Sequence, residues 1–307
     1  MSELPEAPLW QQLQGLVPVM PTPLAADESL DLAGIQRLAE FIGGYPFSGI
    51  WALATAGEDE NLPEEVIGNC ALQFVRYLGE HLAVLVKTSR PGTRETIERT
   101  RRLAQHGIHG AIVHFQHKRL GRDHARRHFE AVAEASPVPI LIYHNATRGA
   151  LLDTDLLIEL SHHPNIAGMK AGGSDLAQLQ RLCLFAADDF AVMTAGGGQL
   201  LAGLAMGAAA HTAIPLLAFP ERAFAVRDAV AAGDLPAARA QQRVVNDFLA
   251  RMPKLQNREV CGEVKCVLEI RGVIERHVSA PFIAATDAQR DEMARLIDEL
   301  DLFGTGV

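Results

Sequence analysis

The chain has few of the features that mark secreted, metal-binding or membrane proteins. It contains only four cysteines in 307 residues, with no CxxC pair and no metal-ligand spacing: Cys70, Cys183, Cys261 and Cys266. No apolar run approaches the roughly eighteen residues that a membrane helix needs. The opening segment, MSELPEAPLWQQLQG, has early acids and no basic stretch before an apolar core, so it does not resemble a secretion signal. We therefore expect buried free thiols in a reducing cytoplasm, with no metal and no membrane contact.

Positive charge is also scarce. There are 28 lysines and arginines against 37 acids, which gives a formal net charge of −9 and a pI of about 5.7. That balance argues against nucleic acid or an anionic membrane as a partner, although a local arginine can still bind a small anionic substrate. With 48% hydrophobic residues, the composition is typical of one large globular domain, with or without an appendage.

What the chain does contain is a regular alternation of short apolar runs and longer amphipathic segments. An example of the latter is 93–107, for which Thr93 and Gly107 are the predicted caps. Eight runs are apolar on both faces, as expected for parallel strands covered by helices. They are 16–20, 49–53, 82–87, 110–115, 139–144, 166–170, 190–194 and 208–213.

Eight strand–helix units predict an α/β protein with a (β/α)8 TIM barrel, a fold that usually takes about 250 residues. A doubly wound open sheet is the main alternative. It is disfavoured because VMPTPLAADESLD, after the first strand, has no glycine-rich dinucleotide loop. We assign residues 1–232 to the barrel, as the catalytic domain, and 233–307 to a C-terminal helical extension packed on it, because the latter segment is helical in pattern only.

In this fold the catalytic groups lie at the C-terminal ends of the strands and in the loops that follow. That rule brings together several polar or small residues that are far apart in the sequence. They are Thr55, Ala56 and Glu58 after the second strand, Tyr143 and Arg148 at and after the fifth, Lys170 on the sixth, and Gly196 and Gly197 after the seventh.

Lys170 carries the strongest signal, since it is one of only five lysines and stands at a strand end beside two glycines. An amine in a dry barrel interior loses the hydration of its charged form, which makes the neutral amine available to attack a carbonyl carbon. The resulting protonated imine is an electron sink that eases the making and breaking of neighbouring bonds. The structural alternative is a lysine that reaches the barrel rim or pairs with an acid.

The other candidates have weaker individual signals. Tyr143 is a candidate general acid–base, Thr55 its proton-relay partner, and Arg148 a two-pronged carboxylate binder. Gly196 and Gly197, within AGGG at 195–198, would either cradle a phosphate at a helix start or form a tight turn beneath the substrate. As structural alternatives, a tyrosine packs at the rim, an arginine stays in solvent and a threonine caps its loop.

Several motifs together resemble the dihydrodipicolinate synthase / N-acetylneuraminate lyase family, the pyruvate-type class I aldolases. ATAGEDENLPEE at 54–65 resembles the family's GTTGE-type loop, YHNATRG at 143–149 its YNxPxR segment, and GMK at 168–170 its GIK. The combined spacing of loop, tyrosine and lysine is more specific than any one motif.

The resemblance implies a Schiff base between Lys170 and a 2-oxo acid, with Tyr143 as proton relay and Thr55 as its partner. It also implies that backbone N–H groups of Thr55 and Ala56 hold the substrate carboxylate and that Arg148 binds a further carboxylate. No metal or organic cofactor is implied, and the family is commonly a homotetramer.

The sequence departs from the family pattern at several of these places. The second hydroxyl residue of the loop is replaced by Ala56, and HFQHKRLG at 114–121 lacks the tyrosine that many members carry there. His114 and His117 are candidates to replace that phenol. Lys87 is a second amine at a strand end. These departures argue against the lysine-biosynthesis synthase reaction and leave imine chemistry in place.

The sequence thus predicts a Schiff-base-forming lyase, a class I aldolase that cleaves or forms a carbon–carbon bond to pyruvate. Its substrate would be a small-molecule 2-oxo acid such as a 3-deoxy sugar acid. A dehydratase, or a dihydrodipicolinate synthase-like condensing enzyme, would use the same imine. A non-catalytic protein that binds a 2-oxo acid is the alternative of a different class.

Overall fold

The computed structural model describes residues 6–145, 149–150, 152–172, 175–255 and 260–304. The core of this part is one sheet of eight parallel strands in the order β1-β8-β7-β6-β5-β4-β3-β2. Each lies within or beside one of the eight predicted runs. The strands are β1 (Gly15–Pro18), β2 (Gly49–Ala52), β3 (Ala83–Lys87), β4 (Gly110–Val113), β5 (Ile140–Asn145), β6 (Ile166–Gly172), β7 (Ala191–Ala195) and β8 (Ala210–Ala213).

The sheet curls into a barrel, which closes between its two outer strands. Just beyond β1, Val19 pairs in parallel with Trp51 of β2, and the Met20 N–H donates to the Trp51 carbonyl over 2.9 Å. Every residue of β2, β3, β4 and β8 is buried, which agrees with strands that are apolar on both faces.

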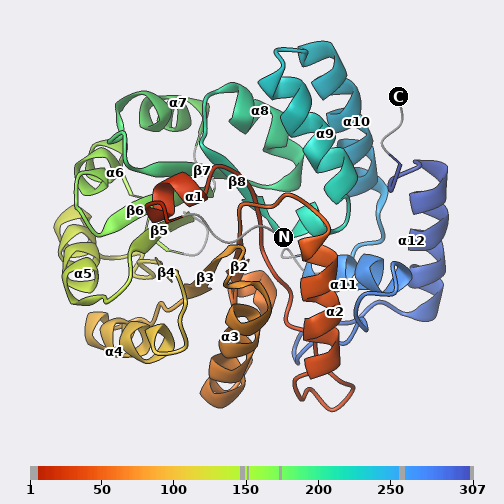
Figure 1. Cartoon of the computed structure of the whole chain (residues 1–307), viewed down its shortest axis with the longest axis horizontal. Helices are drawn as coiled ribbons and strands as arrows, with labels where there is room; N and C mark the ends of the chain where they lie inside the picture. The colour runs from red at the N-terminus through yellow and green to blue at the C-terminus, as the bar shows by residue number, and fades with distance from the viewer. Residues whose placement is uncertain (1–5, 146–148, 151, 173–174, 256–259, 305–307) are drawn as a thin grey trace.

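Helices connect the strands and surround them, as Figure 1 shows. The (β/α)8 prediction is therefore confirmed. The surrounding helices are α2 (Leu32–Gly43), α3 (Glu64–Leu78), α4 (Thr93–Ala104), α5 (Arg122–Ala135), α6 (Thr154–Ser161), α7 (Leu176–Phe185), α8 (Leu200–Ala205) and α9 (Pro220–Ala231).

Local sequence explains where several helices begin. Asp31 and Asp153 cap α2 and α6 by accepting backbone N–H bonds of 2.9 and 2.8 Å. Both predicted caps of α4 are wrong by one or two residues: Gly92 occupies the N-cap position, with Thr93 as the first helical residue, and Gln105 is the C-cap in place of Gly107. The Thr93 hydroxyl instead forms a hydrogen bond of 2.8 Å with the ring of His128, because the packing of α4 against α5 brings the two side chains together.

The N-terminal end of the barrel is covered by the short helix α1 (Leu9–Gln12). The buried side chains of Leu9 and Leu13 pack closely on Gly110 and Gly49, the first residues of β4 and β2. A Cβ added to Gly110 would lie 2.7 Å from Leu9, and one added to Gly49 would lie 3.2 Å from Leu13. The active end of the barrel is consequently the opposite one, where the strands finish.

Three helices follow α9 and lie along one side of the barrel (Figure 1). They are α10 (Leu235–Arg251), α11 (Cys261–Ile270) and α12 (Asp287–Glu299). α10 packs on α9, and α11 packs on η3 (Ile214–Leu217), the turn after β8. These are the expected C-terminal helices, while a domain boundary at residue 232 stays a prediction. Within the described ranges no helix has both the length and the apolar character needed to cross a bilayer.

Candidate active site

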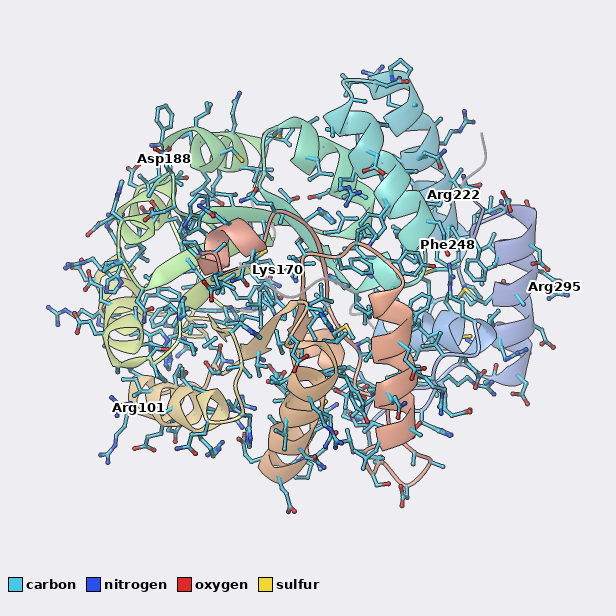
Figure 2. The ribbon with its side chains drawn as sticks, viewed as in Figure 1. Arg101, Lys170, Asp188, Arg222, Phe248 and Arg295 are labelled. Atoms are coloured by element: carbon cyan, nitrogen blue, oxygen red, sulfur yellow. The ribbon has the colours of Figure 1, made fainter. Side chains whose placement is uncertain are left out.

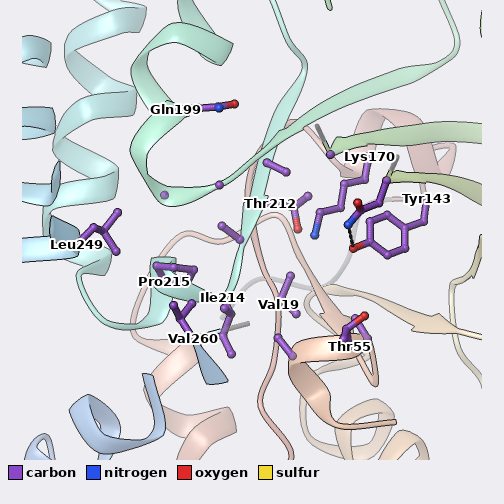
Figure 3. A pocket seen from close by; sticks show the side chains of 18 of the residues that line it. Val19, Thr55, Tyr143, Lys170, Gln199, Thr212, Ile214, Pro215, Leu249 and Val260 are labelled. Carbon is purple, nitrogen blue, oxygen red and sulfur yellow. Dashed lines mark hydrogen bonds between the residues drawn. The ribbon is translucent and has the colours of Figure 1, made fainter. Parts of the chain in front are cut away.

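A cavity of about 560 Å³ opens at the C-terminal ends of the strands. Figure 3 shows its lining, to which β5, β6, β7 and β8 contribute. The segments that follow β1, β2, β7 and β8, and the end of α10, complete it. Seven residues are predicted to take part in catalysis or substrate binding, and six of them line this cavity: Thr55, Ala56, Tyr143, Lys170, Gly196 and Gly197. The seventh, Arg148, lies outside the described residues.

Lys170 lies on β6 beside Tyr143 of β5 and Met193 of β7. It stands near the centre of the molecule, whereas Arg101 and Arg295 lie at the periphery (Figure 2). Its Nζ is 4.8 Å from the ring centroid of Trp51 and 5.1 Å from that of Tyr143. No carboxylate in the described part of the chain forms an ion pair with it. The nitrogen thus faces aromatic rings and an open cavity.

The other lysines have different surroundings. Lys87 is 2% exposed, and its Nζ lies 3.0 Å from Asp59 and 3.1 Å from Glu60. Lys265 is fully buried and lies 2.5 Å from Glu58. Both amines form buried ion pairs with carboxylates, while Lys118 and Lys254 are exposed. Among the lysines, all of which the structure describes, only Lys170 is partly enclosed without a carboxylate partner.

Tyr143 is 6% exposed, and its ring packs edge-on against Trp51 with centroids 5.5 Å apart. Its hydroxyl accepts a hydrogen bond of 2.9 Å from Asn145 Nδ2 (Figure 3). Sequence reasoning did not assign a role to Asn145 or Trp51. The period of two along a strand, which puts residues 143 and 145 on one face, is the signal that would have found Asn145.

Thr55 and Ala56 begin the turn η1 (Thr55–Gly57), which follows β2. The Thr22 hydroxyl donates to the Gly57 carbonyl over 2.6 Å, and a Cβ on Gly57 would approach the Met20 carbonyl to 3.0 Å. The turn is therefore fixed against the chain that leaves β1, and it presents Thr55 and Ala56 to the cavity.

Glu58 ends this turn in the left-handed region, at φ +64°. Besides its ion pair with Lys265, it accepts hydrogen bonds from the Ser279 backbone at 2.5 Å and the Ser279 hydroxyl at 2.7 Å. The carboxylate thus has a structural role in the loop, since it accepts a backbone N–H bond as well as the ion pair. The bonds tie the loop to the C-terminal helices rather than to itself.

Gly196 and Gly197 form the opposite wall, after β7. Gly196 has φ +91°, which favours glycine, and a Cβ on Gly197 would come within 3.0 Å of Leu249 on α10. Anion binding and a tight turn beneath the substrate both stay predictions for this wall. Among the described residues, no three His, Cys, Asp or Glu side chains are grouped to hold a metal ion.

The two histidines offered as replacements for the missing tyrosine lie in different places. His114 is 4% exposed, and its ring lies 5.0 Å from the Tyr143 ring. His117 is exposed and bonds the Pro91 carbonyl at 2.7 Å. His114 also lines a second cavity, of about 500 Å³, that shares Thr55 with the first and has Lys87, Arg90 and Lys118 in its wall.

The sequence matches the model of the Dihydrodipicolinate synthetase family over residues 12–300. This chain belongs to that family. A relative from Moorella thermoacetica, named 4-hydroxy-tetrahydrodipicolinate synthase, is 26% identical over 290 residues, which is 94% of this chain and 98% of the relative.

Solved structures agree on the fold. The dihydrodipicolinate synthase of Bacteroides thetaiotaomicron superposes with a TM-score of 0.88 at 21% identity. The superposition covers 94% of this chain and 98% of the synthase chain. The sialic acid aldolase of Ruminococcus gnavus has a TM-score of 0.86 at 19% identity, with the same coverage. As a member of the dihydrodipicolinate synthetase family, the chain is an enzyme of the lyase class, a pyruvate-dependent class I aldolase or condensing enzyme.

Proposed function

We propose that the protein is a Schiff-base lyase that cleaves a 2-oxo acid, such as a 3-deoxy sugar acid, to pyruvate and an aldehyde. One observation carries the proposal: the Lys170 amine lies beside an open cavity and two aromatic rings, and no carboxylate among the described residues pairs with it. The other amine at a strand end, that of Lys87, is instead paired with the carboxylates of Asp59 and Glu60.

In the cleavage direction, the neutral Lys170 nitrogen attacks C2 of the substrate, and water leaves as the protonated imine forms. Tyr143, aided by Thr55, takes the proton of the C4 hydroxyl. The C3–C4 bonding electrons then flow into the imine, an aldehyde departs, and an enamine remains. A proton adds to C3, and water returns to C2 to release pyruvate and free the amine.

Substrate binding follows from the same wall of residues. Backbone N–H groups of Thr55 and Ala56 would hold the carboxylate next to C2, with Gly196 and Gly197 opposite. Arg148 would bind a further acidic group. The rest of the substrate would extend past Thr55 toward the second cavity, whose lysines and arginine suit a polyhydroxy acid.

Two other reactions would use the same imine. A condensing reaction is favoured by the name 4-hydroxy-tetrahydrodipicolinate synthase among the relatives, and an aldol cleavage by the sialic acid aldolase among the solved structures. A dehydratase would expel water from the substrate instead of an aldehyde. Pyruvate release from a panel of 2-oxo-3-deoxy acids separates these cases, because only the aldolase forms pyruvate directly.

Borohydride reduction in the presence of pyruvate tests the imine itself. We expect a covalent adduct that peptide mapping places on Lys170 and that is absent from the Lys170→Ala variant, which should keep its fold by circular dichroism. An adduct on Lys87 would contradict the site assignment. No adduct at all would favour the non-catalytic alternative, a protein that only binds a 2-oxo acid.

We also propose a cytoplasmic homo-oligomer, a tetramer by family resemblance. Another solved structure with this fold is titled the first monomeric dihydrodipicolinate synthase variant, which suggests that assembly is the rule among such enzymes. The mass in solution tests this, and a monomer at micromolar concentration would contradict it.

A further inference from the structure

One buried polar group in the catalytic cavity has no partner among the described residues. Thr212 on β8 is 0% exposed and lines the cavity, and its hydroxyl oxygen makes no hydrogen bond with any of them. A buried hydroxyl without a partner costs roughly 1–3 kcal/mol, and most such groups in proteins are satisfied. A hydrogen-bond partner on a bound substrate would explain why this buried hydroxyl has none among the described residues.

The register of the sheet places this hydroxyl on the same face as the nucleophile. Lys170 lies level with Met193 on β7, and Met193 lies level with Ala210 on β8. Thr212 is two residues beyond Ala210, so it faces the barrel interior one step nearer the open end. In Figure 3 the Thr212 hydroxyl and the Lys170 amine both extend into the same cavity.

The neighbouring threonine has the opposite orientation. Thr194 on β7 pairs in register with His211, the residue before Thr212, and its hydroxyl bonds the His211 ring at 2.8 Å. It is 2% exposed and does not line the cavity. Of these two adjacent buried hydroxyl groups, one is satisfied within the fold and the other is left facing the site.

We propose that the Thr212 hydroxyl is a further catalytic group, which donates a hydrogen bond to the C2 oxygen of the 2-oxo acid while the imine forms. This inference rests on the imine mechanism proposed above. As the Lys170 nitrogen bonds to C2, the electrons of the C2=O double bond move onto that oxygen. Tyr143 relays one proton from the nitrogen to the oxygen, which becomes a hydroxyl and leaves a lone pair on the nitrogen again. The hydroxyl takes a second proton from the Tyr143 phenol and leaves as water, and the nitrogen lone pair closes the C=N bond.

In these steps Thr212 keeps its own proton and stabilises the charge that develops on the oxygen. Tyr143 remains the group that transfers protons. Ala56 also lines the cavity, but its methyl group cannot donate a hydrogen bond. Thr212 therefore supplies a second hydroxyl, which the loop after β2 lacks at residue 56. A donor aimed at developing charge in an enclosed site commonly contributes about 100-fold or more to the rate.

The test is the rate at which pyruvate becomes trapped on Lys170 by borohydride under single-turnover conditions. Thr212→Val keeps the shape of the side chain and should slow trapping by about 100-fold. Thr212→Ser restores a hydroxyl and should recover most of that rate. Since the valine variant loses an unsatisfied group, its Tm should be unchanged or higher, so slower trapping would not reflect a damaged fold.

Thr194→Val is the matched control, because it removes a satisfied hydroxyl that faces away from the cavity. It should lower the Tm and leave the trapping rate unchanged. Trapping at the wild-type rate in Thr212→Val, or a serine variant as slow as the valine variant, would overturn the inference. If Thr212→Val fails to fold, Thr212→Ala makes the same comparison. Absence of trapping in the wild-type protein would instead overturn the imine mechanism itself.

Discussion

At the scale of single residues, the surroundings of each lysine decide what its amine can do. Lys87 and Lys265 are more buried than Lys170, yet each lies within 3.0 Å of a carboxylate. A buried charged amine needs such a partner to compensate for its lost hydration. Trp51 and Tyr143 offer Lys170 a weaker attraction through their ring faces. Burial alone would have selected the wrong lysine.

The Tyr143 hydroxyl is the proton carrier in the proposed reaction, and its removal separates two steps. We expect Tyr143→Phe to lower kcat for pyruvate release by about 100-fold or more, because general acid–base catalysis typically contributes that much. The adduct on Lys170 should still form with borohydride, since the phenylalanine ring keeps its place against Trp51.

Tyr77→Phe is the matched control, because Tyr77 lies on α3, outside the residues that line the cavity. It should leave kcat unchanged. A Tyr143→Phe enzyme with full turnover would show that another group, such as Thr55 or His114, carries the proton.

At the scale of elements, the active site depends on a helix from the far end of the sequence. Glu58 ends the turn η1, and Lys265, 207 residues later, lies on α11. Their ion pair has both side chains at 0% exposure, and Cys261 on α11 also lies 3.5 Å from the carboxylate. The C-terminal helices therefore fix the loop that carries Thr55 and Ala56.

We expect Glu58→Gln to destabilise the fold, because it leaves the Lys265 ammonium buried without a counter-charge. Breaking one partner of a buried pair typically costs about 3–5 kcal/mol in the free energy of unfolding. Urea unfolding at pH 7 measures this loss. The KM for the 2-oxo acid in the pyruvate-release assay should rise as well, because η1 loses its attachment to α11.

Glu98→Gln is the matched control, since it breaks an exposed pair with Arg94, a kind of pair that contributes at most about 1 kcal/mol. The double variant Glu58→Gln/Lys265→Met removes both buried charges and should recover part of the stability. If Glu58→Gln were as mild as Glu98→Gln, the buried pair would not hold the loop.

At the scale of the whole molecule, buried histidines connect stability to pH. Burial lowers the pKa of His128 and of His144 to about 4, and it lowers the pKa of His211 to about 3. In the unfolded chain each has a pKa near 6.5. Between these values the unfolded chain binds protons that the folded chain does not, so stability falls as the pH decreases.

We expect the free energy of unfolding to drop between pH 7 and pH 5, with each of these histidines contributing on the order of 2 kcal/mol. His128→Gln should make that drop smaller by about the same amount. His124→Gln, on the same helix α5 but exposed, should leave the drop unchanged. Urea titrations at both pH values give the comparison, and equal drops in all three proteins would contradict the assignment.

The sequence by itself determined the barrel, the end at which the site lies, and most of its candidate residues. This was possible because strand and helix periods are local properties, and because a (β/α)8 barrel converts each strand's last residues into neighbours. Thr55, Tyr143 and Lys170 could be placed together from that rule alone, and the structure places all three on one cavity.

Only the tertiary structure decided which partly enclosed lysine has no carboxylate partner among the described residues. It also decided which threonine faces the cavity and what holds the loop after β2. The partners of Lys87, Lys170 and Glu58 come from segments up to 221 residues away, and Thr194 and Thr212 differ only in the face they occupy. Charge compensation and hydrogen bonding act over a few ångströms in space, whatever the separation along the chain. A sequence pattern can name these groups, but only the folded distances determine which of them are satisfied and which are left for a substrate.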